Sequence, residues 1–259
     1  MTARIAALFR HPIKGFTPEK VKLAQLVAGG PFPGDRLYAL EDGPSGFDPA
    51  APAWITKQRF AVLAKIAEVA KAKTRLDDAT GVLHASADGM PAFAGKLSEP
   101  QGRAAFAAWT TDLLGEAATG PLRLLDGGPS WRFLDHPLGH VSIINLASVR
   151  DLEQRVGRPL DPLRFRANLY VDGWPAWAEN DWEGRPLALG AAKAKVFKTI
   201  VRCAAPDVNP DTAIRDADVP AALFDNYGHT LCGIYVQVTE GGVVREGDAV
   251  AAGAAVEPA

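Results

Sequence analysis

Short apolar stretches separated by turns dominate the pattern of hydrophobic and polar positions in the first part of the chain. Residues 4–15 run apolar up to a Pro-Ile-Lys-Gly turn, and residues 20–29 and 35–42 flank the loop GGPFPGD. Short apolar runs bounded by glycine and proline are typical of β-strands. We therefore predict a strand in each of these three stretches.

The stretch at residues 61–78 is compatible with either a helix or a strand by residue propensity. Its apolar positions alternate, and a DDATG turn separates it from residues 82–89. Alternation on both sides of a tight turn favours a β-hairpin. We therefore expect these two stretches to pair.

Two stretches have the pattern of amphipathic helices. The first is residues 99–115, where Ser98 is placed to cap the start and a glycine follows the last helical turn. The second is residues 145–157, with Asn145 at the N-cap position and a glycine at the end. Polar caps before a helix and glycine after it are common boundary signals.

The remaining periodic stretches read as strands, and the last of them reads as a closing hairpin with its turn at Gly241 and Gly242. These stretches are residues 121–127, 166–173, 185–203 and 233–252. The Ala-rich end of the chain, residues 250–259, is expected to fray. The pattern therefore predicts an α+β, strand-rich protein with one unit at residues 1–118 and another at residues 119–259.

Composition narrows the function classes. The chain has 259 residues, is 47% hydrophobic and carries a formal net charge of -2, which gives no indication of a nucleic-acid partner. No run of eighteen apolar residues predicts a membrane span, and the first residues lack the apolar core of a signal peptide. Two cysteines do not make a disulfide framework, so we expect a reduced, cytoplasmic protein.

The two cysteines differ in their surroundings. Cys232 lies in an apolar strand without charged neighbours and is expected to be structural. Cys203 follows Arg202 where a strand runs into a polar loop. A small buried hydrophobe is the ordinary role of a lone cysteine, but a neighbouring cation favours a thiolate and loops at strand ends often carry chemistry. Cys203 is therefore the candidate reactive or metal-binding thiol.

Several basic residues fall at predicted strand ends. Lys14 ends the first strand and Arg36 begins another, while the segment RFRANLYVDG contains two arginines and an asparagine within five residues. Each alone is compatible with a solvated surface base. Together with Arg202 they are suited to hold a phosphate and a polar heterocycle, because the guanidinium fork matches oxyanions and ring edges.

These segments, in their order along the chain, resemble a known family. The segments are HPIKG, GDRLYAL, TKQRFAVLAKI, FRANLYVDG, DWEG, VRCAAPDVNPDT and GIYVQVTEGGVVREGD. They are similar to MOSC proteins that also carry a MOSC N-terminal domain, a group that includes the mitochondrial amidoxime reducing component and its bacterial relatives. The resemblance implies an N-terminal MOSC-type β domain followed by a MOSC β-barrel.

The resemblance also implies a molybdenum cofactor, Mo-molybdopterin, and a role for each candidate residue. Cys203 matches the thiolate that ligates the metal, a sensible ligand because thiophilic metals prefer soft sulfur. Lys14 and Arg36 match the phosphate-binding positions, Arg166 and Asn168 match the pair that contacts the pterin, and Arg202 lies beside the metal ligand. One departure is Gly15, where many relatives have serine, so that a hydroxyl toward the phosphate is lost.

By the same resemblance the protein is expected to reduce N-hydroxylated or other N-oxygenated small molecules. The sequence has neither plant-type iron–sulfur cysteine spacing nor a GxGxxG fingerprint. Electrons are therefore expected from a separate ferredoxin, flavoprotein reductase or cytochrome b5-like protein. Two alternatives stay open, namely a persulfide carrier or cofactor-binding module without reductase activity, and a cysteine hydrolase that uses one of the five histidines.

The segment DGWPAWAENDWEG is rich in aromatic and acidic residues. Its three tryptophans are expected to pack in the core or between domains, with a wall of the cofactor site as the alternative. Glu179 and Asp181 are candidates for a patch that docks an electron donor, although an acidic loop is more often simply solvated.

Overall fold

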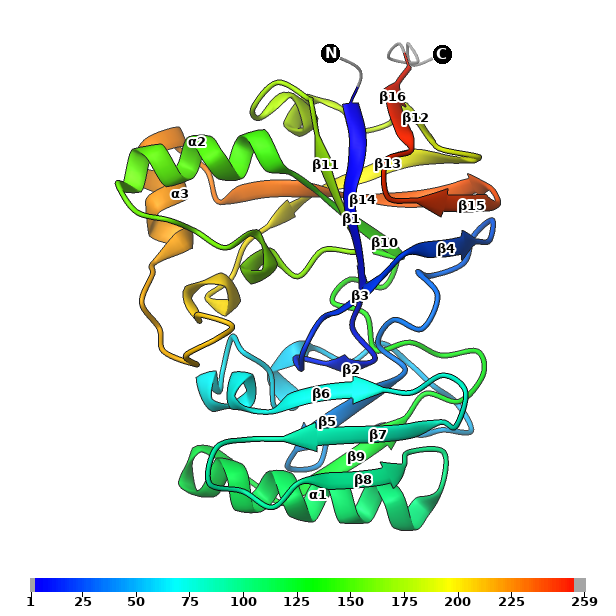
Figure 1. Ribbon diagram of the computed structural model, residues 1–259, viewed down its shortest axis with the longest axis vertical. Helices are drawn as coiled ribbons and strands as arrows, with labels where there is room; N and C mark the ends of the chain where they lie inside the picture. Colours follow the sequence, from blue (N-terminus) through cyan, green and yellow to red (C-terminus); the bar gives the residue numbers. More distant parts are fainter. Residues whose placement is uncertain (1–2, 254–259) are drawn as a thin grey trace.

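The computed structural model describes residues 3–253 and has two layers stacked along its long axis. A barrel layer contains both ends of the described chain, and a lower layer contains the middle of the N-terminal half (Figure 1). None of the helices in residues 3–253 is long and apolar enough to cross a bilayer. The connections that pass between the two layers are where the candidate site lies.

Seven strands close into the barrel. Their order is β11-β10-β14-β13-β12-β16-β1, and the ring closes because β1 also pairs with β11, while β3 extends the sheet beside β1. The strands are β1 (Ala3–Arg10), β3 (Glu19–Val21), β10 (Val141–Asn145), β11 (Leu169–Asp172), β12 (Pro186–Leu189), β13 (Ala192–Val201), β14 (Leu231–Glu240) and β16 (Ala249–Ala252). The strand-rich α+β architecture predicted from the sequence is therefore confirmed.

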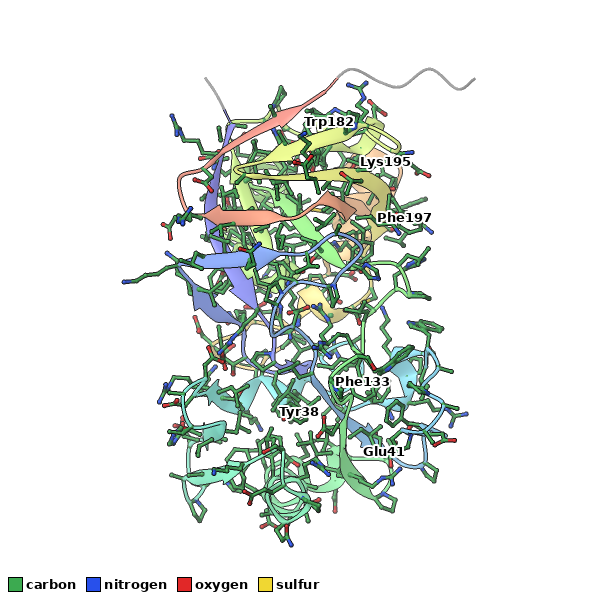
Figure 2. The ribbon with its side chains drawn as sticks, turned by 90° about the vertical axis from the view of Figure 1, so that its right-hand side faces the viewer. Tyr38, Glu41, Phe133, Trp182, Lys195 and Phe197 are labelled. Carbon is green, nitrogen blue, oxygen red and sulfur yellow. The ribbon has the colours of Figure 1, made fainter. Side chains whose placement is uncertain are left out.

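Alternation of side chains fills the barrel. Along β13, Ala192, Ala194 and Val196 are buried, whereas Lys193 and Lys195 between them are exposed. Figure 2 shows Lys195 on the outer side of this layer. Since successive side chains of a strand point to opposite faces, one face of each strand supplies the core and the other meets solvent.

Two helices cover one side of the barrel. Helix α2 (Leu146–Val156) begins as predicted at Asn145, whose side-chain oxygen accepts a hydrogen bond from the Ala147 amide at 3.0 Å. Helix α3 (Val219–Tyr227), capped by Asp218, was not predicted because its nine residues are too few to show a clear period. Both helices pack on an apolar cluster that contains Cys232.

The lower layer consists of two three-stranded sheets and one helix. Its elements are β2 (Ile13–Lys14), β5 (Tyr38–Asp42), β9 (Leu122–Asp126), β6 (Lys73–Leu76), β7 (Val82–Ser86), β8 (Phe93–Lys96) and α1 (Pro100–Leu114). Helix α1 matches the predicted helix, but Ser98 does not cap it, because Glu99 is the N-cap residue and Pro100 occupies the first turn. Its buried Phe106 and Trp109 pack among apolar residues of the layer.

Short elements complete the two layers. A ribbon of β4 (Leu23–Leu26) and β15 (Gly242–Arg245) lies beside the barrel. Six 3-10 helices complete the described chain: η1 (Lys57–Arg59), η2 (Ala67–Lys71), η3 (Gly115–Ala117), η4 (Pro162–Phe165), η5 (Ala178–Asp181) and η6 (Ala205–Asp207).

The predicted hairpin at residues 61–78 is wrong over most of its length. Only β6 pairs with β7, whereas residues 61–72 form turns and η2. The large apolar side chains of that stretch, among them Leu63, Ile66 and Val69, are buried in the core of the lower layer rather than lying on one face of a strand. Burial of these large apolar residues in turns and a 3-10 helix, not strand alternation, therefore describes the conformation there.

The predicted closing hairpin at residues 233–252 is also wrong. Both edges of β14 are taken, by β10 and β13, so β15 pairs with β4 instead. Of the Ala-rich end, residues 250–252 belong to β16 (Ala249–Ala252) rather than fraying, and residues 254–259 lie outside the described range.

The two layers do not coincide with the two halves of the sequence. Strand β1 from the N-terminal half pairs with β11 and β16, and β9 from the second half pairs with β5. The expected division at residue 118 is therefore not a boundary between sheets. The chain crosses between the layers after β1, between β2 and β3, between β4 and β5, and again after β9.

A bulge in β14 positions the end of β13. Pairing shifts register between Thr199 and Val201, opposite Gly233, which has a positive φ of 79°. A Cβ atom built on Gly233 would lie 2.5 Å from the Ile143 carbonyl oxygen and 3.1 Å from the Arg202 guanidinium. Glycine is therefore required both for the backbone conformation and for close approach.

We expect Gly233→Ala to lower the free energy of unfolding by about 2–4 kcal/mol, since it adds a steric clash to a strained φ. Gly89→Ala is the matched control, because Gly89 also has a positive φ of 75° but meets nothing within 4 Å. Urea denaturation of both variants measures the difference. Equal losses would show that the close approach at Gly233 has no energetic weight.

Candidate functional site

A cleft at the junction of the two layers gathers residues from both halves of the sequence. It encloses about 710 Å³ of space, part of it open to solvent. Its polar lining includes Lys14, Arg36, Lys57, Asp135, Ser142, Arg164, Arg166, Arg202, Cys203 and Tyr235. The structure thus brings five of the six predicted site residues to one cavity, although their roles remain a proposal.

Lys14 and Arg36 come together through a shared carboxylate. Lys14 ends β2 and is only 2% exposed, and its Nζ donates to Asp135 Oδ1 at 2.6 Å and to the Phe133 carbonyl at 2.9 Å. Arg36 Nη2 donates to Asp135 Oδ2 at 3.1 Å. Figure 2 shows Phe133 on the lower side of the junction between the layers. One carboxylate therefore bridges two cations that are 22 positions apart in sequence.

A second carboxylate lies behind this pair. Asp35 is completely buried, accepts hydrogen bonds from the His11 amide at 2.7 Å and from His11 Nδ1 at 3.1 Å, and is paired with Arg36. Burial opposes the charged form of Asp35, but Arg36 and His11 lower its pKa below the usual value. Burial alone would likewise lower the pKa of Arg36, yet Asp35 and Asp135 raise it.

The backbone at two site arginines is left-handed. Arg36 has a φ of 49° and Arg166 a φ of 53°, and neither is glycine. The Arg36 amide donates to the His11 carbonyl at 2.7 Å, and Arg166 forms the C-cap of η4. Such conformations cost about 1–3 kcal/mol each and tend to occur at functional sites.

Arg166 is the least satisfied of the cleft cations. Its buried Nη2 has no hydrogen-bond partner among the described residues. Burial, with Arg36 as a second cause, lowers the pKa of Arg166 to about 10. A buried donor nitrogen without an acceptor is costly, so this partly buried side chain is suited to receive a polar or anionic ligand.

Arg202 and Arg164 line the cleft, but their guanidinium groups donate hydrogen bonds to backbone carbonyls of the protein. Arg202 donates to the Cys232 carbonyl through Nε at 2.8 Å and to the Phe165 carbonyl through Nη1 at 2.9 Å. Arg164 donates to Asp216 Oδ1 at 2.7 Å and to two carbonyls of η6. The two arginines therefore fix the segments on either side of Cys203.

Cys203 lies two positions after Val201, the last residue of β13, and is partly exposed in the cleft. Cys232, by contrast, is fully buried, and burial raises the pKa of its thiol to about 12. The expected division into one accessible and one structural cysteine agrees with this geometry. Within residues 3–253 no group of three or more His, Cys, Asp or Glu side chains is arranged to hold a metal ion.

Asn168 does not reach the cleft. Its side-chain oxygen accepts hydrogen bonds from the Ser142 amide at 3.0 Å and hydroxyl at 2.9 Å, and its amide group donates to the Phe9 carbonyl at 3.3 Å. Asn168 is 1% exposed and ties three barrel strands together. Asn168 is not among the residues that line the cleft, and its hydrogen-bonding groups contact Ser142 and Phe9 inside the barrel, so the pterin contact that the resemblance implied stays a prediction.

Gly15 sits tightly against the following loop. It has a φ of 90°, and an added Cβ would lie 3.0 Å from the Ala61 carbonyl oxygen and 3.1 Å from Val62 Cα. The serine that many relatives have here would be strained and crowded. The glycine at position 15 is thus required by the backbone of this chain, and Gly15 lines the cleft without a side chain.

The aromatic and acidic segment lies away from the cleft. Trp174 and Trp182 pack edge to face in the barrel core with ring centroids 4.7 Å apart, and Figure 2 shows Trp182 at the end of the barrel far from the lower layer. Glu179 is completely buried and accepts hydrogen bonds from Asn145 and Ser148. Packing is therefore the role of the tryptophans, and Glu179 cannot belong to a docking patch.

Sequence reasoning missed Asp135, Lys57 and Tyr235. Asp135 lies in a loop without periodicity, so nothing in its spacing signals that it meets Lys14. Tyr235 lies on β14, and burial, followed by the charge of Asp135, raises its pKa to about 12. None of the five histidines, all within the described range, lines the cleft, which weighs against a Cys–His hydrolase.

Two family models, which match consecutive parts of the sequence, together cover nearly the whole chain. The MOSC N-terminal beta barrel domain matches residues 2–120, and the MOSC domain matches residues 132–251. The chain therefore belongs to the MOSC proteins that carry the MOSC N-terminal domain.

Curated relatives and a solved structure are more distant. Mitochondrial amidoxime reducing component 2 of Macaca fascicularis is 30% identical over 120 residues, which is 42% of this chain and 35% of the relative. The Homo sapiens protein of the same name has the same identity and coverage. The match thus spans about a third of these relatives. The YUAD protein from Bacillus subtilis covers 96% of this chain and 94% of its own, at 16% identity and a TM-score of 0.46.

Buried His11 should make stability depend on pH. Burial, with a further contribution from Arg166, lowers the pKa of His11 to about 4, whereas an unfolded histidine titrates near 6.5. Between these values the unfolded chain binds more protons, so the folded state loses stability as pH falls from 6.5 to 4. The loss attributable to His11 should approach about 3 kcal/mol.

Urea unfolding of the wild-type protein and of His11→Gln between pH 7 and 4.5 measures this loss. Glutamine cannot take up the proton, so the variant should show a shallower decline in stability with decreasing pH. Parallel curves for the two proteins would assign the pH dependence to other groups.

Proposed function

We propose that this protein is a molybdenum-cofactor-dependent reductase of N-hydroxylated compounds, with Cys203 as the protein ligand of the metal. The observation that carries the proposal is that one cleft is lined by an accessible thiol, the buried cations Lys14 and Arg36, and the unpaired guanidinium of Arg166. The relatives named amidoxime reducing components support the reaction class.

The donor set fits such a cofactor. A partly exposed thiol is a soft ligand for a thiophilic metal, and ligation would deprotonate it. Lys14 and Arg36 offer two buried cations to a phosphate, and Arg166 Nη2 is a buried donor that still lacks an acceptor. Metal ligands beyond Cys203 would come from the cofactor's own sulfur atoms.

When bound, the cofactor would supply the two-electron chemistry that removes oxygen from the substrate. The residues of the chain would bind the cofactor and orient it and the substrate. Arg202 and Arg164 hold the two sides of the Cys203 segment, so the sulfur stays fixed relative to the arginines. Tyr235 lines the cleft, and its protonated hydroxyl would be able to donate a hydrogen bond to an N-hydroxyl oxygen.

Electrons would come from a separate protein, a ferredoxin, a flavoprotein reductase or a cytochrome b5-like donor. The proposal also places the protein in the cytoplasm, where its two free cysteines would stay reduced. A persulfide carrier remains the competing function, because an accessible thiol fixed beside arginines also suits sulfur delivery.

The test compares Cys203→Ala with Cys232→Ala, both produced in a host that makes the molybdenum cofactor. Cys203→Ala should lose bound molybdenum and reduction of an amidoxime by an artificial electron donor. Cys232→Ala should keep most of both, at a stability cost of about 1–2 kcal/mol for the small cavity. Elemental analysis and the activity assay measure the two outcomes.

Circular dichroism shows whether each variant is folded. Equal loss of molybdenum in two folded variants would refute Cys203 as the ligand. A wild-type protein that carries no molybdenum but holds a persulfide on Cys203, detected by mass spectrometry, would favour the carrier function instead.

A further inference from the structure

Two carboxylates contact Arg36, and only that of Asp135 is placed so that it can move away from Arg36 into solvent. Asp35 is completely buried and held by the amide and the ring of His11. The Asp135 side chain is 36% exposed, and its contacts are Lys14 on one oxygen and Arg36 on the other. Rotation of Asp135 toward solvent would therefore break two ion pairs without exposing core.

We propose that the Asp135 carboxylate occupies the anion site formed by Lys14 and Arg36 and must be displaced by the phosphate of a ligand. Asp135 is then a specificity-determining residue that favours a doubly charged phosphate over singly charged anions. The inference rests on the phosphate-binding role of Lys14 and Arg36 in the proposed function and adds a residue of opposite charge to it.

The two cations cannot turn to meet a ligand elsewhere. Lys14 is enclosed, with its Nζ 5.9 Å from the centre of the Phe60 ring and bonded to the Phe133 carbonyl. Arg36 has Nη1 on buried Asp35 and Nη2 on Asp135. The donors that face the cleft thus converge on the position that Asp135 holds, and an incoming anion has to take that position.

Charge decides which anions succeed. With Asp135 in place, two carboxylates offset the charges of Lys14, Arg36 and Arg166. Burial opposes ionisation of Asp135, yet Lys14 and Arg36 hold its pKa well below the usual value, so the competitor stays charged. A singly charged anion would only replace the single negative charge of the Asp135 carboxylate. A doubly charged anion would bring one more negative charge to the same cations and would therefore be attracted more strongly.

The loop that carries Asp135 is fixed at both ends. Phe133 donates its amide to the Arg36 carbonyl at 3.0 Å and packs its ring on Phe47 and Phe60. At the other end the His140 carbonyl accepts from the Phe32 amide at 3.0 Å. Displacement would therefore be confined to residues between 134 and 139, where the Leu134 carbonyl accepts a hydrogen bond from the Trp54 indole at 3.2 Å.

The test is titration of the cofactor-free full chain with inorganic phosphate by isothermal calorimetry at constant ionic strength. Asp135→Asn should bind phosphate about tenfold more tightly than wild type, the scale expected when one charge-assisted competitor is removed. Glu240→Gln is the matched control, since it removes one charge from an exposed ion pair with Lys193. It should leave phosphate affinity unchanged.

Acetate provides the second arm. It should not compete with phosphate for the wild-type protein but should compete in Asp135→Asn. An Asp135→Asn variant that is folded and binds phosphate no more tightly than wild type would overturn the proposal, as would acetate competing equally in both proteins.

Tryptophan emission gives an independent readout. Saturating phosphate should change the emission of the wild-type protein, and this change should disappear in Trp54→Phe. No change in the wild-type protein at saturation would contradict displacement of the loop. These experiments use no cofactor, so they test the inference separately from the proposed function. If the protein never carries molybdenum but Asp135→Asn still binds phosphate more tightly than wild type, the proposed function fails and the inference stands.

Discussion

The burial of positive charge at the junction of the two layers is the constraint on which the site depends. Lys14 and Arg36 are nearly inaccessible, and an unpaired charge in such a position would be strongly destabilising. Asp35, fixed by His11, and Asp135, reaching in from a loop of the second half, offset that charge. The Lys14–Asp135 ion pair therefore joins residues 121 positions apart in the sequence, and Arg36 contacts the same carboxylate across 99 positions.

Backbone geometry also determines the position of Cys203. The bulge at Gly233 allows β14 to approach β10 closely, and Arg202 then reaches the Cys232 and Phe165 carbonyls. Because the Arg202 guanidinium is bonded to these carbonyls, it orients the segment that carries Cys203 instead of binding a ligand. Arg166, whose buried Nη2 has no partner within residues 3–253, is the cleft arginine best suited to a ligand, while Arg164, whose Nε also lacks a partner there, already pairs with Asp216.

The sequence predicted the strand-rich architecture and the chemistry of the cleft better than its connections. Lys14, Arg36, Arg166 and Cys203 stand out because charged residues and a thiol at strand ends are visible in one dimension. The pairing of β15 with β4 is not, since it depends on both edges of β14 being occupied by strands far away in sequence. Asn168 was assigned to the ligand through the family resemblance, whereas its hydrogen bonds to Ser142 and Phe9 exist only in the folded barrel. Asp135 was invisible for the same reason.

The most direct measurement of the central claim is a crystal structure of the protein purified from a cofactor-competent host, with diffraction data collected on both sides of the molybdenum absorption edge. The account predicts an anomalous peak bonded to Cys203 Sγ and a phosphate group in contact with Lys14 and Arg36. A molybdenum peak away from Cys203, or a bound cofactor whose phosphate lies on another face of the molecule, would contradict it.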